Sequence, residues 1–171
     1  MPNAFNLIHV YWKIYLNVLL IVFLKDQVGL ADDFLSKVLS KHLKENLEKI
    51  LSQQQFKAAG IGNNKKFTQN KLIRSDLIYW LDRAHNDIHE NSFFDLMDEF
   101  VAYLNKTCYT GITSYEFHYA GGELCIYNKD HSQTIAPVNG KSVFFRSAEL
   151  EHEVLLSHKP RMIITGWLKT N

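Results

Sequence analysis

Apolar residues recur with helical spacing between residues 34 and 51. Leucines fall at every fourth position of this stretch, and Phe34 and Val38 widen the apolar stripe. The leucines are Leu35, Leu39, Leu43, Leu47 and Leu51. Asp32 or Asp33 precedes them and can cap the first turn. The pattern predicts a helix that covers a sheet with its apolar face.

A second helix is predicted from Ser92 to about Gly111. Ser92 and Asp95 have the spacing of a capping signal, and glycine commonly follows the end of a helix. The apolar positions are Phe93, Leu96, Met97, Phe100, Val101 and Leu104. Their spacing is typical of a face that packs in a core, not of a cofactor site.

Alternation of apolar and polar residues predicts strands in the rest of the chain. Over 114–120, Tyr115, Phe117 and Tyr119 point to one face of a strand, and His118 points to the other. We expect His118 to be a core or interface histidine.

Residues 73–81 alternate imperfectly and predict a strand that enters a helical turn. Arg74 and Asp76 fall on one face of it. The resemblance to a known family described below implies that the two side chains support the rim of a pocket. The alternative is a surface ion pair that contributes little.

Residues 151–156 and 161–168 are predicted to be two strands of one hairpin. Arg161 and Trp167 share a face of the second strand, and His152 lies on the first. If the two faces coincide, an imidazole, a guanidinium and an indole line one wall. Since an arginine inside an apolar sheet needs an anionic partner, a small diacid would fit there.

These segments and their order resemble the prolyl-hydroxylase-like branch of the Fe(II)- and 2-oxoglutarate-dependent dioxygenases, over about residues 28–171. The matching segments are 32–36, 58–62, 73–81, 114–120, 121–127, 135–138, 142–147, 152–154 and 161–167. The resemblance implies an α+β fold with N-terminal helices packed on a double-stranded β-helix, which is a cupin-like jelly roll.

The resemblance also implies a site. In that family an H-x-D pair and a distal histidine hold the iron, 2-oxoglutarate fills two of the three open positions, and oxygen takes the third. By resemblance, His152 is the distal histidine, Arg161 binds the far carboxylate of 2-oxoglutarate, and Trp167 walls the pocket. An intact relative would hydroxylate a prolyl or similar side chain in a peptide, or a small-molecule substrate, release succinate and CO2, and use ascorbate to keep the iron reduced.

The chain departs from the family where Ala120 directly meets Gly121. The family has the H-x-D pair and at least two strands at this point, so two of the three iron ligands are missing and no catalytic residue is assigned. We therefore expect a truncated double-stranded β-helix that is inactive as it stands. The alternative is a non-catalytic pseudoenzyme that binds a carboxylate or peptide through the Arg161 pocket or an open sheet edge. Open edges also predict self-association.

Two other pairs could supply metal ligands. His85 and Asp87 have the letters of an H-x-D pair, but on a helix their side chains would diverge by about 200°. Asp130 and His131 lie in a polar stretch that predicts a solvated turn. Neither pair replaces the missing ligands.

Composition fits one small globular domain. The chain has 171 residues, of which 46% are hydrophobic and 22% charged, and its net charge of +1 gives no basis for binding nucleic acid. Cys108 and Cys125 are far apart, which favours reduced thiols in a cytoplasmic protein. Cys108 is expected to pack at a helix end and not to act as a nucleophile.

Residues 1–27 form an apolar extension to this domain. Residues 4–24 are heavily apolar, but Lys13 interrupts them, which makes a membrane-spanning helix costly. A membrane anchor or export signal, a packed or interfacial helix, and an incorrectly assigned start of the protein all remain open.

Overall fold

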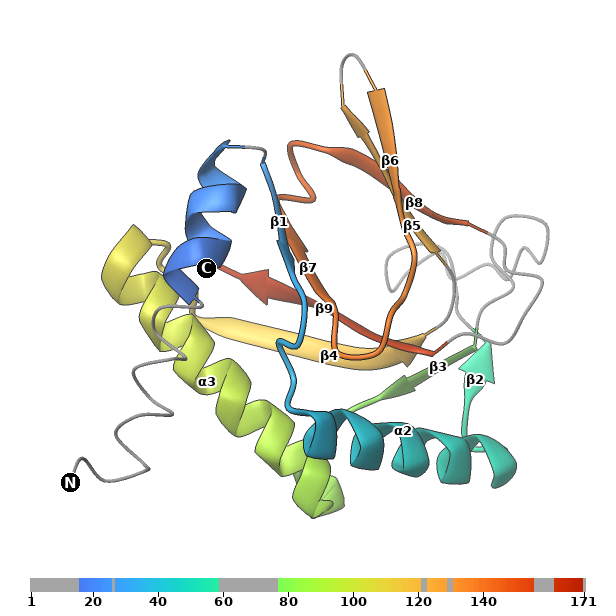
Figure 1. Ribbon diagram of the computed structural model, residues 1–171. Helices are drawn as coiled ribbons and strands as arrows, with labels where there is room; N and C mark the ends of the chain where they lie inside the picture. Colours follow the sequence, from blue (N-terminus) through green and yellow to red (C-terminus); the bar gives the residue numbers. More distant parts are fainter. Residues whose placement is uncertain are drawn as a thin grey trace, which may run out of the picture. The chain divides into compact units, whose positions relative to one another are not determined.

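The computed structural model describes residues 16–25, 27–58, 77–120, 123–128, 131–155 and 162–170 (Figure 1). The chain divides into two compact units, each built from two separate stretches of sequence. The first unit contains residues 1–37 and 124–153, and the second contains residues 38–123 and 154–171. We describe each unit by itself.

The second unit is built on a four-stranded antiparallel sheet in the order β2-β3-β4-β9. The strands are β2 (Lys57–Ala58), β3 (Leu77–Trp80), β4 (Ser114–Ala120) and β9 (Ile163–Lys169). β4 pairs with β9 along its whole length, from Ser114 opposite Lys169 to Ala120 opposite Ile163. The two seven-residue strands of this sheet are therefore paired with each other.

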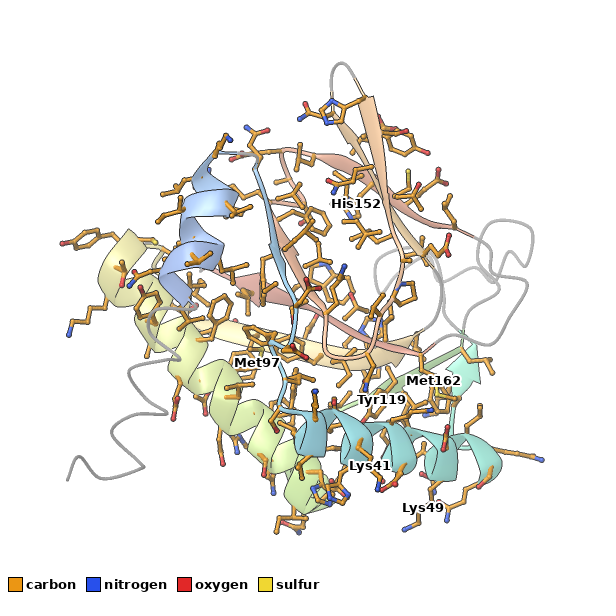
Figure 2. The ribbon with its side chains drawn as sticks, in the orientation of Figure 1. Lys41, Lys49, Met97, Tyr119, His152 and Met162 are labelled. Carbon is orange, nitrogen blue, oxygen red and sulfur yellow. The ribbon has the colours of Figure 1, made fainter. Side chains whose placement is uncertain are left out.

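Two helices, α2 (Lys37–Ser52) and α3 (Ile88–Cys108), lie along one face of this sheet (Figure 1). The Phe117 ring packs edge-on against Phe93 of α3, with 5.0 Å between the ring centroids. Tyr119 points toward α2 (Figure 2), and its hydroxyl lies 3.5 Å from the Leu43 carbonyl oxygen. The predicted aromatic face of β4 is confirmed.

The predicted apolar stripe of α2 is only partly correct. The helix begins at Lys37, and its buried apolar residues are Leu43, Leu47 and Ile50, whereas Val38 and Leu51 are exposed. A repeat of four residues advances about 40° further than a full turn at each step. Leucines spaced in this way spiral around the helix, so the outermost positions leave the buried face.

The predicted start of α3 is wrong by one turn. Asp87 caps the helix, and its side chain accepts hydrogen bonds from the backbone N–H groups of His89 and Glu90. Ser92 lies inside the helix, where its hydroxyl donates to the Ile88 carbonyl oxygen. At the other end Tyr109 takes the left-handed conformation, with φ of 53°.

The first unit contains a helix over 16–25, a two-stranded sheet and a three-stranded sheet (Figure 1). β1 (Val28–Ala31) pairs with β7 (Ser142–Phe145). β6 (His131–Ile135), β5 (Glu123–Asn128) and β8 (Glu151–Leu155) form the second sheet in that order. One buried apolar cluster of the unit contains Val28, Ile126, Ile135 and Leu150.

The helix over 16–25 packs closely on β1 at Gly29. A Cβ atom on Gly29 would lie 3.0 Å from a methyl carbon of Leu19 and 3.3 Å from Cβ of Phe23. Glycine therefore permits this close approach. Within the part of the chain that the structure describes, no helix has the length and apolar character needed to cross a membrane.

The hairpin predicted for 151–156 and 161–168 is wrong. β8 is a neighbour of β5, whereas β9 pairs with β4 in the other unit. Alternation along a strand fixes which side chains share a face, but it does not choose the neighbouring strand. In jelly-roll folds successive strands commonly belong to different sheets, and this is the case here.

Two local predictions have mixed outcomes. The strand that enters a helical turn is confirmed for its described residues, since β3 (Leu77–Trp80) is followed by the 3-10 helix η1 (Arg83–His85), whereas residues 73–76 lie outside the described residues. In the polar stretch around His131, the described residues belong to strands: Asn128 ends β5 and pairs with His131, which begins β6. Asp130 lies outside the described residues.

Candidate functional site

His152 lies on β8 in the first unit (Figure 2). Its Nδ1 is 2.9 Å from the carbonyl oxygen of Leu150, and its ring meets Phe145 edge-on with 4.8 Å between centroids. A carbonyl oxygen only accepts, so Nδ1 carries the proton of the neutral ring and Nε2 keeps the lone pair. A histidine held in this way is prepared to bind a metal through Nε2.

Trp167 lies on β9 in the second unit, and 41% of its surface is exposed. Its ring stacks on His118 at 5.3 Å between centroids, and Trp80 lies 6.5 Å away. His118 is 1% exposed and also contacts Trp80, at 4.8 Å. The expected buried histidine is therefore confirmed, and it is part of an aromatic group with the two tryptophans.

Three residues of the predicted site lie outside the described part of the chain. These are Arg161, Arg74 and Asp76. His152 belongs to the first unit and Trp167 to the second. The shared wall of imidazole, guanidinium and indole stays a prediction.

His85 and Asp87 do not form a chelating pair. Asp87 caps α3, whereas Nδ1 of His85 lies 3.0 Å from the buried Glu90 carboxylate. Glu90 also accepts a hydrogen bond from the Asn46 side chain at 3.2 Å. The polar contacts that His85 and Asn46 make with Glu90 therefore connect η1, α3 and α2.

The Glu90 cluster was not predicted from the sequence. In the sequence, Glu90 is one of several polar residues just before Ser92. No feature of that stretch indicates that the Glu90 side chain is buried, with 1% of its surface exposed. Burial raises the pKa of Tyr119, and the neighbouring carboxylates of Glu90 and Asp87 raise it further. The same causes raise the pKa of Tyr79. Both tyrosines therefore stay protonated and neutral.

The two cysteines, Cys108 and Cys125, both lie within elements of secondary structure. Cys108 ends α3 and is half-buried, as expected for packing at a helix end, and Cys125 is buried on β5. Across the described ranges, no group of three or more His, Cys, Asp or Glu side chains is placed to hold a metal ion.

Comparison with known families decides the class of the protein. A sequence profile of the 2OG-Fe(II) oxygenase superfamily matches residues 81–169, which is more than half of the chain. The chain belongs to the 2OG-Fe(II) oxygenase superfamily. The match begins at Leu81, before α3, and ends within β9, so it includes His152, Arg161 and Trp167.

Solved structures show the same fold. A prolyl-4-hydroxylase from Pseudomonas putida has a TM-score of 0.81 and 21% identity, over 90% of this oxygenase-family chain and 98% of its own. A prolyl hydroxylase from Trichoplax adhaerens, in complex with a hypoxia inducible factor peptide fragment, has a TM-score of 0.82 and 16% identity, over 98% and 94% of the two chains. No curated protein matches the sequence. The jelly-roll α+β fold expected from the sequence is confirmed.

Membership in the superfamily implies Fe(II) and 2-oxoglutarate. Among the described residues the donor set is a single oriented imidazole, that of His152, without two further donors beside it. These residues therefore do not fit a three-ligand iron site by themselves.

Proposed function

We propose that this chain is a catalytically deficient member of the 2OG-Fe(II) oxygenase superfamily. The observation that carries the proposal is the junction of β4 and β5. β4 ends at Ala120 and β5 begins at Glu123, so only Gly121 and Gly122 lie between them. The H-x-D pair expected at this point by resemblance has no equivalent, because glycine offers no side-chain donor.

The state of His152 supports the same proposal. Its Nε2 lone pair is available for a metal, but one imidazole binds Fe(II) weakly, because the affinity of such sites comes from several preorganised ligands. His85, the nearest alternative in sequence pattern, is already engaged with Glu90. The chain would keep one of the three iron ligands, His152, and lack the other two.

We further propose that carboxylate binding through Arg161 persists without metal. A guanidinium pairs with a carboxylate in bidentate geometry whether or not iron is present. The ligand would be 2-oxoglutarate or the side chain of a peptide. The peptide bound by the Trichoplax adhaerens relative motivates this choice of partner.

An anaerobic titration with Fe(II) and 2-oxoglutarate tests the proposal. The chelated co-substrate of an intact site gives a weak visible charge-transfer band, and we expect no such band here. Calorimetry should show weak 2-oxoglutarate binding that does not depend on Fe(II) and is lost in Arg161→Ala. Lys49→Ala, which removes a cation from α2, is the matched control.

A charge-transfer band in the native chain would contradict the proposal. A band that develops in the native chain and disappears in both His152→Ala and Arg161→Ala, but not in His42→Ala, would mean that other residues complete the triad. The proposal of catalytic deficiency would then be wrong.

A further inference from the structure

The first unit contains a pocket of about 650 Å³, lined by residues of that unit alone. It lies between the helix over 16–25, β1 and the β5-β6 hairpin, elements that can be followed in Figure 1. A volume of this order is ordinary for a small-molecule site. Nothing in the proposed oxygenase site uses it.

The floor of the pocket is apolar and firmly packed. Val28, Ile126 and Leu150 line it, and each is at most 8% exposed as part of the core of the unit. Val22 and Leu30 add further aliphatic surface. A hydrocarbon placed here would contact side chains that are already fixed by the fold.

The rim is polar because of the register of the hairpin. Ile126 pairs with Gln133 and Asn128 pairs with His131, so these four side chains share one face of β5 and β6. Ile126 reaches the core, whereas the residues nearer the hairpin turn are polar and line the opening. Apolar and polar surface therefore follow one another along the same face.

Among the described residues that line the pocket, Lys25 is the charged one. Lys25 ends the helix over 16–25 and is a permanent cation at neutral pH, and His131 faces the same space from β6. No Asp or Glu is among the described residues that line the pocket. A ligand with an anionic group at the rim is favoured over a neutral or cationic one.

We propose that this pocket binds a small amphipathic carboxylate. The hydrocarbon would lie on the floor formed by Val28, Ile126 and Leu150, and the carboxylate would meet Lys25 at the rim, with donors from His131 and Gln133 beside it. The proposed site does not require iron, and Arg161 is not among the described residues that line it.

Methyl-detected NMR on the full chain tests the site. Titration with octanoate should shift the methyl signals of Ile126 and Leu150 saturably and leave those of Leu43 and Leu47, on α2, unchanged. Hexanoate should bind about tenfold more weakly, since each buried methylene changes affinity about three- to fourfold. 1-Octanol, which lacks the charge, should also bind more weakly than octanoate.

Lys25→Met tests the charge with little change in side-chain volume. We expect it to weaken octanoate binding at least fivefold and to leave octanol binding unchanged, whereas Lys49→Met should change neither. Gln133→Glu, which adds an anion to the rim, should also weaken octanoate binding. Methyl shifts spread equally over both units, equal affinity for octanoate and octanol, or native octanoate affinity in Lys25→Met would each overturn the proposal.

Discussion

His152 shows what a sequence reveals about a single site residue. Its position relative to Arg161 and the order of neighbouring segments identify it as the distal histidine by resemblance. The Leu150 carbonyl oxygen, two residues earlier on the backbone, favours the ring tautomer with its proton on Nδ1. Since backbone groups are the same at every position, no pattern of side chains could predict that contact.

Gly166 has no room for a side chain. A Cβ atom there would overlap the carbonyl oxygen of Glu116 and the ring of Phe117. We predict that Gly166→Ala lowers the free energy of unfolding by about 3 kcal/mol, because β4 and β9 must separate. Urea denaturation measures this change.

Gly111→Ala is the matched control for that substitution. Gly111 has φ of +65° but no atom within 4 Å of the added Cβ, so only backbone strain of about 1 kcal/mol is expected. Equal losses in the two variants would show that the close contact with Phe117 does not determine the requirement for glycine.

The raised pKa of Tyr119 makes the free energy of unfolding depend on pH in alkaline solution. Burial raises its pKa in the folded chain, whereas in the unfolded chain a tyrosine ionises near pH 10. The stabilisation is complete below pH 10 and is lost as the pH rises from there toward the folded pKa. From pH 10 upward the free energy of unfolding should fall by up to about 1.4 kcal/mol per pH unit from this group.

Tyr119→Phe isolates this contribution. The variant should have a shallower alkaline decline in urea denaturation between pH 9 and about pH 11. Some decline should remain, because burial also raises the pKa values of Tyr79 and Tyr115. An alkaline slope identical to that of the native chain would mean that Tyr119 ionises as readily in the folded state as in the unfolded one.

At the scale of elements, the sequence predicts which segments form helices and strands better than where they end or what they pair with. The alternation in 114–120 gave the correct helix-facing side of β4, since Tyr115, Phe117 and Tyr119 meet residues of α2 and α3. The partner of β8 was predicted wrongly, because pairing depends on distant parts of the chain.

The start of α3 allows the two possible caps to be separated by experiment. Asp87→Ala removes an acceptor for two backbone N–H groups and should lower the free energy of unfolding by about 1 kcal/mol. Ser92→Ala removes only a hydroxyl that bonds within the helix, so its effect should stay below about 0.5 kcal/mol. Thermal or urea unfolding measures both. A larger loss for Ser92→Ala would place the functional cap where the sequence alone suggested it.

At the scale of the whole molecule, the order of segments identified the superfamily, although no single motif did so. The profile match over 81–169 and the two prolyl hydroxylase structures agree with an order that was visible in the sequence. What the sequence could not supply is the division into two units, each of which joins an early and a late stretch of the chain. Such a division depends on contacts between distant residues.

The sheet edges lead to a prediction about assembly. Among the described strands, β8 lies at the end of its sheet, and its Val154 is 49% exposed. An exposed apolar side chain on an edge strand favours pairing with another chain, and a lysine there opposes it. We predict concentration-dependent association of the native chain, reduced in Val154→Lys and measured by size-exclusion chromatography with light scattering.

Val38→Lys places the same charge on the exposed face of α2, away from any strand, and should leave association unchanged. If both lysines reduced association equally, net charge and not the β8 edge would be its cause, and a monomer at every concentration would exclude edge pairing as a property of this chain.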